Sequence, residues 1–457
     1  MNLVEWLQQP EGKTLEFKRD LSSPDGALRS IVAFANTAGG TLLVGVEDGT
    51  RHVRGVREPH ALEERLANLI SDSIVPRLVP DIDVLRWRRT HVIAIEVHAS
   101  PTRPHFLKSA GAEAGVFVRV GSTNRRADAE TRQELLRVVR GESYDEQGLP
   151  EFDSEALDFR AASESFAEVR KLTPAALRAL RLITRHQRRN VPTVGGFLLF
   201  GKDRHLAFPD AWIQVGRFRG IDRSQIEDHL ELREYPVRAI LAAIAFVHKH
   251  MERAASIGAV RRTDRWTLPP AAIREALINA VVHADYSQRG APIRVALFDD
   301  RLEIESPGLL PFGLTVEDLQ QGISRLRNRV IARVFQELGL IEQWGSGIQR
   351  MNAACAELGL ARPKLEEVGM RFRVTIESTP TLTPVIDPLD GAILAALEKR
   401  GGLSTQQIAH SIGRTTRAAR TRLARLVERG LVREVGTGPQ DPRRRYFKAT
   451  AGSRRRR

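Results

Sequence analysis

Cysteine is nearly absent from this chain, because Cys355 is the only one among 457 residues. A single cysteine excludes both an intramolecular disulfide framework and a cysteine-rich zinc site. Cys355 lies in MNAACAEL, a helical pattern in which a small buried side chain is the expected role. The sequence therefore favours neither disulfide nor zinc chemistry.

Long hydrophobic runs are also missing. The longest apolar helical stretch, Ala239 to Val247, is about half as long as a membrane span. The opening MNLVEWLQQPEGK turns polar after a few residues and lacks the pattern of a secretory signal. We therefore expect a soluble, cytoplasmic protein without a membrane partner.

The sequence lacks the phosphate loop G-x-x-x-x-G-K-[ST] that a helicase motor needs, so a helicase of that type is excluded. Hydrophobic residues make up 42% of the chain, which is enough for globular packing. The length suggests about three domains.

Positive charge is distributed unevenly. The net charge is +14, and residues 391–457 hold 17 Lys and Arg against 4 Asp and Glu. Residues 1–390 are close to neutral, with 53 basic and 52 acidic side chains. A compact C-terminal module with this excess attracts polyanions, and the phosphate backbone of nucleic acid is the expected partner.

Strand-like and helix-like segments alternate along the chain, which predicts an α+β multidomain protein. TLLVGVED, HVIAIEVHA and GVFVRVG are predicted strands, and DGALRSIVAFANTAGG is a predicted helix that stops at its two glycines. Further along, GGFLLFG and AWIQVGRFRG are predicted strands. The expected divisions are a domain over 1–140, a linker over 141–160, a middle segment over 161–265, a domain over 266–378, a linker over 379–390 and a domain over 391–457.

The last domain has the rhythm helix, turn, helix, turn, helix, hairpin. A short helix, QQIAHSI, is expected to end at Gly413, and the next helix begins near Thr415. Burial of Ala418 and Leu423 on that helix would leave arginines on its free faces. This region resembles winged helix-turn-helix domains, with LVREV and RRRYF as the wing. The resemblance and the charge imply binding of duplex DNA by Arg417, Arg420, Arg422, Arg425, Arg443, Arg444 and Arg445.

The run REALINAVVHADY places Glu275 and Asn279 four residues apart on one helix face. Residues 175–378 resemble the divergent branch of the gyrase and histidine-kinase (GHKL) ATPase superfamily that is found in RecG-like regulators. The resemblance implies ATP with Mg²⁺ as the ligand. Glu275 would orient water or act as a base, and Asn279 would coordinate the magnesium.

Two glycine-containing turns complete this predicted nucleotide site. Gly345 and Gly347 would let backbone amides approach phosphate at the start of a helix. Superfamily members use an aspartate to accept a hydrogen bond from adenine, whereas IESPG places Ser306 there, followed by Gly308. A nucleotide sensor, a weak ATPase and a fold retained for oligomerisation are the alternatives.

The segments RSIVAFANTAGGTLLVGVEDGT and GVFVRVGSTNRRAD resemble the Schlafen and AlbA-like nucleic-acid-binding domain, over about residues 8–140. In nuclease members, two glutamates spaced E-x-x-x-x-E-x-K and a later aspartate form a divalent-metal site. EGKTLEFK matches this spacing. The resemblance therefore implies Mg²⁺ or Mn²⁺ at Glu11, Glu16 and Asp48, with Lys18 beside them to stabilise developing charge.

The same acidic residues also have a structural interpretation. Glu16 and Lys18 would form an exposed ion pair on one strand face, and Asp48 would be a turn residue. Arg103 and His105 are expected in an exposed basic loop. Phosphate contacts are expected around the RVGSTNRRA turn, from Arg119, Ser122, Thr123, Asn124, Arg125 and Arg126.

Three functions follow from these patterns. The first is a homo-oligomeric transcription regulator that binds duplex DNA and whose central domain senses nucleotide. The second is a metal-dependent nuclease that cuts structured RNA or DNA, for example in phage defence. The third is an ATP-driven protein of the gyrase-like superfamily.

Overall fold

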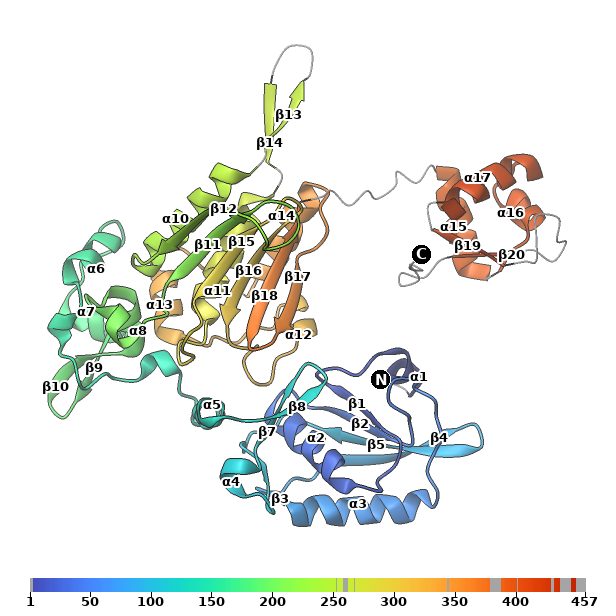
Figure 1. Ribbon diagram of the computed structural model, residues 1–457, viewed down its shortest axis with the longest axis horizontal. Coiled ribbons are helices and arrows are strands. Elements are labelled where there is room, and N and C mark those ends of the chain that lie inside the picture. Colours follow the sequence, from blue (N-terminus) through green and yellow to red (C-terminus); the bar gives the residue numbers. More distant parts are fainter. Residues whose placement is uncertain are drawn as a thin grey trace. The chain divides into compact units, whose positions relative to one another are not determined.

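The computed structural model describes residues 3–251, 253–257, 262–266, 268–342, 345–378, 388–400, 402–428, 431–435 and 445–448. The chain divides into two compact units, Met1–Pro380 and Thr381–Arg457 (Figure 1). Several mixed sheets with covering helices confirm an α+β multidomain protein. None of the helices in the described residues is long and apolar enough to cross a bilayer.

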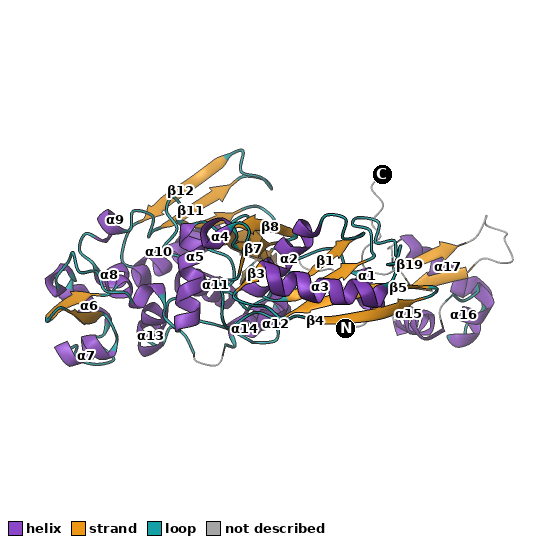
Figure 2. Ribbon diagram, turned by 90° about the horizontal axis from the view of Figure 1, so that it is seen from below, coloured by secondary structure: helices purple, strands orange, loops and turns teal. Residues whose placement is uncertain are grey.

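The amino-terminal sheet has the strand order β1-β2-β5-β4 and is covered by helices on both faces (Figure 2). Alternation along the strands divides the core: Leu42 and Ile93 pack with α2 and α3, whereas Phe17 and Leu43 pack with α1. The predicted strands and the glycine stop after the helix are confirmed. These elements are α1 (Leu3–Gln8), β1 (Leu15–Lys18), α2 (Pro24–Asn36), β2 (Gly40–Val44), α3 (Pro59–Ser73), β4 (Asp81–Trp87) and β5 (Thr90–Val97).

A hairpin and a helix follow this sheet. Strands β7 and β8 pair antiparallel, with Val118 opposite Arg125. Asp128 caps the next helix, because its carboxylate accepts the Thr131 N–H at 2.8 Å. The elements are β3 (Ile74–Val75), β6 (Phe106–Leu107), α4 (Gly111–Ala114), β7 (Phe117–Val120), β8 (Thr123–Arg126) and α5 (Ala129–Arg140).

Residues 141–200, part of which we expected to be a linker, are packed. Asp145 is fully buried and its carboxylate accepts the N–H groups of Val330 and Ile331 at the start of α13 (Arg329–Glu337). The segment thereby fixes that helix. It contains η1 (Tyr144–Glu146), η2 (Ser154–Ala156), α6 (Phe159–Ser165), α7 (Pro174–Ala179), β9 (Ile183–His186), β10 (Arg189–Pro192) and α8 (Val194–Phe200).

The prediction of a strand over GGFLLFG was wrong, because these residues form α8. Thr193 caps the helix by accepting the Gly196 N–H at 3.0 Å. Every residue of α8 is buried, so no polar face marked the helical period. A Cβ at Gly196 would stand 2.0 Å from the Leu182 carbonyl oxygen, which explains the glycine.

A six-stranded sheet of order β12-β11-β15-β16-β18-β17 is the largest sheet among the described residues of this unit (Figure 1). On β16, Leu302 and Ile304 point into the core, whereas Glu303 and Glu305 point to the other face and pair with arginines. Period-two alternation therefore places Ser306 on the core face. The strands are β11 (Ile213–Phe218), β12 (Ile226–Leu232), β15 (Ile293–Leu297), β16 (Arg301–Pro307), β17 (Lys364–Val368) and β18 (Arg371–Glu377).

Helices pack on that core face. Cys355 is buried among them as predicted, and burial raises the pKa of its thiol to about 11. A separate hairpin joins two further strands. The remaining elements of this unit are α9 (Arg204–Ala207), α10 (Pro236–His250), β13 (Arg253–Ile257), β14 (Arg262–Trp266), α11 (Pro270–His283), α12 (Val316–Gln320) and α14 (Gly347–Glu357).

In its described residues, the C-terminal unit has three helices and a two-stranded wing, as predicted. Ser404 and Gln407 form a capping box at the second helix, and Gly413 ends it with φ 61°. Leu403 and Tyr446 exchange backbone hydrogen bonds, which ties the wing to the turn before that helix. The elements are α15 (Pro388–Arg400), α16 (Thr405–Ser411), α17 (Thr416–Glu428), β19 (Val432–Val435) and β20 (Arg445–Lys448).

Candidate nucleotide pocket and nucleic-acid interface

A pocket of about 420 Å³ lies between α11, α13, α14 and the core face of the six-stranded sheet. This volume is within the range of small-molecule and cofactor sites. The residues predicted to bind nucleotide come from separate segments of the chain, and all of them line this one pocket. They are Glu275, Asn279, Ser306, Gly308, Gly345 and Gly347.

Glu275 is buried at one end of the pocket, and both of its oxygens have partners. Oε1 accepts from Asn279 Nδ2 at 3.2 Å, and Oε2 pairs with Arg350 Nη2 at 2.9 Å. Arg350 also bonds to Glu342 at 2.6 Å. The predicted i, i+4 pair is confirmed as a contact, with the Asn279 amide oriented by the carboxylate.

Gly347 begins α14 directly against Glu275. A Cβ at this position would stand 2.1 Å from Glu275 Oε1, so only glycine permits this approach. The carboxylate lies beside a helix N-terminus, where negative charge is favoured. The end of the pocket at the start of α14 is therefore lined by the negatively charged carboxylate of Glu275.

Sequence reasoning missed a set of arginines in the pocket. Arg329 and Arg333 stand one helical turn apart on α13, and Nη1 of Arg333 is buried without a hydrogen-bond partner among the described residues. The four-residue spacing of Arg329 and Arg333 in RNRVIARVFQEL was the feature of the sequence that could have indicated them.

The lining of the pocket has four arginines and two glutamates, Glu275 and Glu342. The Arg329 guanidinium bonds to Gly141 and pairs with Glu146 outside the pocket, and the other three still exceed the glutamates, so the charge favours an anionic ligand. The four arginines are Arg325, Arg329, Arg333 and Arg350.

Ser306 lies at the sheet wall of the pocket and is buried, next to Ile304 and Val374. Burial lowers the pKa of His283, another lining residue, to about 4, so its ring is neutral at pH 7. Gly308 has φ 97°, and a Cβ there would meet Arg327 Nη1 at 2.0 Å. The sheet end of the pocket is thus mostly apolar, with a single hydroxyl.

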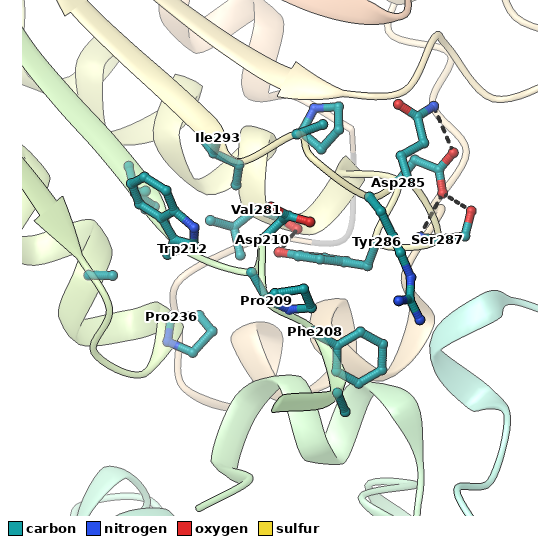
Figure 3. A pocket seen from close by; sticks show the side chains of 18 of the residues that line it. Phe208, Pro209, Asp210, Trp212, Pro236, Val281, Asp285, Tyr286, Ser287 and Ile293 are labelled. Atoms are coloured by element: carbon teal, nitrogen blue, oxygen red, sulfur yellow. Dashed lines mark hydrogen bonds between the residues drawn. The ribbon is translucent and has the colours of Figure 1, made fainter. Parts of the chain in front are cut away.

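Figure 3 shows a smaller cavity of about 60 Å³, with Trp212 on one side and Tyr286 at its centre. The Tyr286 hydroxyl donates to the Val281 carbonyl at 3.0 Å, and burial raises its pKa. Asp210 accepts the Gly290 N–H at 2.6 Å. This volume is far below the size of a nucleotide site, so the cavity is structural.

The carboxylates predicted to bind metal are near one another, but Glu16 has cationic partners. It is 5% exposed and pairs with Lys18 and with Arg119 Nη2, the latter at 2.5 Å. Burial raises the pKa of Glu11, and the charges of Glu16 and Asp48 act in the same direction. The expectation of an exposed, weak Glu16–Lys18 pair was therefore wrong.

A divalent cation does not fit this arrangement. At Glu16 it would have to displace the guanidinium of Arg119, which is fully buried and repels it. Glu11 accepts the Phe17 N–H at 2.7 Å and so has a structural role. Across the described parts of the chain, no three His, Cys, Asp or Glu side chains are grouped to hold a metal ion.

Arg119 was predicted to contact phosphate, and this was wrong because its side chain is fully buried. It donates to the carbonyls of Gly12 and Leu15 and to Asn124 Oδ1, at 3.0, 3.3 and 2.9 Å. Asn124 in turn donates to Ser30 Oγ, so its amide is also engaged. These residues join β7, β8 and α2 rather than facing solvent.

The exposed part of this turn is smaller than predicted. Ser122, Arg125 and Arg126 are exposed, whereas the hydroxyl of the exposed Thr123 donates to the Val120 carbonyl at 2.9 Å. The expected basic loop was also wrong in part: Arg103 is buried and bonds to the Ser100 carbonyl, and His105 is 1% exposed. Arg125 and Arg126 on β8 remain as the candidate phosphate contacts.

Helix α17 presents three exposed arginines, Arg417, Arg420 and Arg425. The prediction for Arg422 was wrong, since its Nη1 pairs with the buried Asp390 at 2.7 Å. On the core side Leu423 is buried as predicted, and Ala419 rather than Ala418 is the buried alanine. In the wing, Arg445 is exposed and donates to the Gly402 carbonyl, while Arg443 and Arg444 lie outside the described residues.

Three segments of the chain match known protein families. Residues 11–128 match "Schlafen, AlbA_2", residues 290–376 match "Putative ATP-dependent DNA helicase recG C-terminal", and residues 386–433 match "Winged helix-turn-helix DNA-binding". The three matches have the order expected from the sequence motifs, and the second of them begins at residue 290, after Glu275 and Asn279.

Two solved structures are similar to this chain. The DIP2311 protein from Corynebacterium diphtheriae is 22% identical over 96% of this chain and 92% of its own, with a TM-score of 0.42. The N-terminal domain of a RecG-related protein from Nitrosomonas europaea is 22% identical over 27% of this chain and 91% of its own, with a TM-score of 0.22. By its family matches, the chain contains a Schlafen AlbA_2 segment, a RecG-type C-terminal ATPase-like segment and a winged helix-turn-helix segment of the DNA-binding type, in this order.

Proposed function

We propose that this protein is a transcription regulator that binds duplex DNA and a purine nucleotide. The observation that carries the DNA part is the exposed arginine face of α17, formed by Arg417, Arg420 and Arg425. Guanidinium groups on such a helix read guanine edges in the major groove and neutralise phosphates. Arg125 and Arg126 of β8 supply a second contact surface. The regulator would act in the cytoplasm as a homo-oligomer.

ATP with Mg²⁺ is the proposed ligand of the 420 Å³ pocket. Asn279 would coordinate the magnesium, Arg333 would pair with phosphate, and the apolar sheet end near Ser306 would hold the purine ring. A serine hydroxyl both donates and accepts, so it suits a polar ring edge. Magnesium would neutralise phosphate charge next to Glu275.

The contacts of Glu275 favour nucleotide binding over hydrolysis. A carboxylate that orients water must face the bound substrate, whereas each oxygen of Glu275 is held by a group of the protein, one by Asn279 and the other by Arg350. We therefore propose that the pocket senses nucleotide. The pairing of Glu16 with Lys18 and Arg119 counts against the nuclease alternative.

The test is DNA binding by fluorescence anisotropy with a labelled promoter-sized duplex over a range of KCl concentrations. We expect the triple variant Arg417→Ala, Arg420→Ala and Arg425→Ala to lose at least about tenfold in affinity and to show a shallower salt dependence. Arg160→Ala removes an arginine that is equally exposed in another domain and should change nothing. Equal affinity of the triple variant and the native chain would refute the proposal.

Nucleotide binding is tested separately, by calorimetry with the non-hydrolysable analogue adenylyl-imidodiphosphate and Mg²⁺. Asn279→Ala should abolish the magnesium-dependent part of the binding. The control is Gln336→Ala, which truncates an exposed pocket-rim residue of similar size and should leave affinity within about twofold. Failure of the native chain to bind the analogue would remove the sensor from the proposal.

A further inference from the structure

One stretch of chain, residues 309–327, is both a wall of the nucleotide pocket and a contact surface for the amino-terminal domain. It leaves the end of β16 at Gly308, includes α12 and leads into α13. Gly308 and Gly313 have φ values of 97° and 92°, which places two sharp turns around its first residues. The pocket-lining members of this 309–327 segment are Leu309, Leu310, Pro311, Leu314, Leu319, Ser324, Arg325 and Leu326.

Phe312 lies among these lining residues but its ring packs elsewhere. It is 7% exposed and belongs to a hydrophobic cluster with Val118 and Val120 of β7 and Leu135 of α5. Its carbonyl accepts from Arg325 Nη1 at 2.8 Å, which ties it to the far end of the segment. Phe312 therefore joins a pocket wall to the amino-terminal domain.

Two residues that form ion pairs with the amino-terminal domain, Glu367 and Arg327, also hold the backbone of Leu309 and Leu310. Glu367 Oε1 accepts both the Leu310 N–H at 2.8 Å and the ammonium of Lys13 at 2.6 Å, and the side chains of this pair are 7% and 14% exposed. Arg327 donates to the Leu309 carbonyl at 2.7 Å and pairs with Glu134 of α5 at 3.1 Å. A shift of Leu309 or Leu310 thus disturbs contacts with the amino-terminal domain.

The contacted hairpin is the one with exposed arginines. Phe312 belongs to one hydrophobic cluster with Val118 and Val120 of β7, and Val118 pairs across the hairpin with Arg125 of β8. Closely packed side chains transmit a displacement rather than absorbing it, because the interior has little free volume. The proposed path therefore runs from the pocket wall at Leu310 to Phe312, then to Val118 in the same hydrophobic cluster, and then to its strand partner Arg125.

We propose that a nucleotide in the pocket changes the DNA affinity of the β7–β8 hairpin through the 309–327 segment, with Phe312 as the connecting residue. The ligand would bear on Leu309, Leu310 and Leu314, and the Phe312 ring would move with them. This coupling regulates the proposed nucleotide site, and it therefore requires the proposed function to be right. Linkage makes it reciprocal: DNA must change nucleotide affinity by the same factor.

The experiment measures both affinities on the full chain, with the duplex, adenylyl-imidodiphosphate and constant Mg²⁺. In the native chain we expect the analogue to change the dissociation constant for DNA by about fivefold or more, and DNA to change that for the analogue equally. Asn279→Ala controls for direct competition between the polyanions, since it leaves the arginines intact and removes only the magnesium-dependent binding of the analogue in the pocket. No effect of the analogue is expected in that variant.

Phe312→Ala should reduce the coupling to less than about twofold while both ligands still bind. Its matched control is Ile323→Ala, which removes an apolar side chain from the same segment at a site 49% exposed to solvent and should keep the native coupling. Lys13→Gln, which breaks the pair with Glu367 and leaves the core intact, is a second uncoupling variant in case Phe312→Ala does not fold. The double variant Arg125→Ala and Arg126→Ala should bind DNA through the winged helix, uncoupled.

Each outcome decides a different claim. Native coupling that is lost in Phe312→Ala or Lys13→Gln supports the inference. Binding of both ligands without any mutual effect, or full coupling retained in both variants, overturns it and leaves the proposed function standing. A native chain that binds no analogue removes the nucleotide sensor and the coupling together.

Discussion

At the residue scale, the buried Arg119–Glu16 pair gives a structural role to a carboxylate that the sequence predicted to bind metal. Removing one partner from such a pair leaves an unpaired buried charge. Because Arg119 is fully buried, we expect Glu16→Ala to destabilise the sheet around β1 by about 3–5 kcal/mol. Hydrogen exchange of the amides of Leu15–Lys18, followed by mass spectrometry, measures the local loss of protection.

Lys18→Ala is the control for that experiment, since the Lys18 side chain is 31% exposed and can be lost without leaving a buried charge. It should lower protection only slightly. If Glu16→Ala exchanged as slowly as the native chain, the Arg119 network would not be the structural element that we describe.

Asp145 makes a pH-dependent contribution to stability. Burial raises its pKa from 3.8 to about 6, and this outweighs its bonds to Ser143 and to the N–H groups of α13. The folded state thus binds the proton more tightly than the unfolded state. The favourable contribution is present below pH about 4 and is lost as the pH rises to about 6.

Asp145→Asn should remove this pH dependence. Relative to the native chain, we expect the variant to gain up to about 3 kcal/mol of stability between pH 4 and pH 7. The measurement is hydrogen exchange of the α13 amides at both pH values, corrected for the intrinsic rates. A difference between the two proteins that stays constant with pH would contradict the raised pKa.

At the scale of elements, α17 separates arginines of two kinds. Arg420 is exposed, and its replacement by alanine should weaken DNA binding, reduce the salt slope by about one and leave stability unchanged. Arg422→Ala should instead destabilise the winged helix by roughly 2–4 kcal/mol, because Asp390 stays buried without this pair. Thermal unfolding measures the stability of each variant, and fluorescence anisotropy measures its affinity for DNA. Equal losses of stability in the two variants would contradict the distinction between Arg420 and Arg422.

Several elements were predictable from the sequence. The strands of the amino-terminal sheet followed from their composition and length, and the i, i+4 spacing places Glu275 and Asn279 on one face of α11, whereas their role in a nucleotide site was implied by the family resemblance. The prediction for α8 failed because all of its residues are buried, and a uniformly apolar run does not show the period of a helix.

Tertiary contacts account for the other differences. The sequence shows that Arg119 is basic and close to a turn, but its carbonyl partners belong to Gly12 and Leu15, more than a hundred positions away. In the same way, nothing near Phe312 in the sequence indicates that it packs on β7. Side chains that connect distant segments have no local signature, and these connections decide which arginines are free to bind DNA.

At the scale of the whole molecule, charge and architecture coincide. The net charge of residues 391–457 is almost the entire excess of the chain, and these residues lie within the compact unit Thr381–Arg457. The unit Met1–Pro380 contains the pocket and the hairpin with Arg125 and Arg126. We therefore expect the C-terminal unit to supply most of the salt-dependent DNA affinity and the first unit to supply its regulation.

A chain truncated after Pro380 tests this division, because it ends at the boundary between the compact units. Removing the arginine face of α17 and the wing should cost at least about tenfold in duplex affinity at 150 mM KCl and make the salt dependence shallower by about three. Binding of adenylyl-imidodiphosphate should be unchanged, since every pocket residue is retained, and this serves as the folding control. An unchanged salt slope would instead place the main DNA contact on the amino-terminal domain, with Arg125 and Arg126 as the first residues to replace.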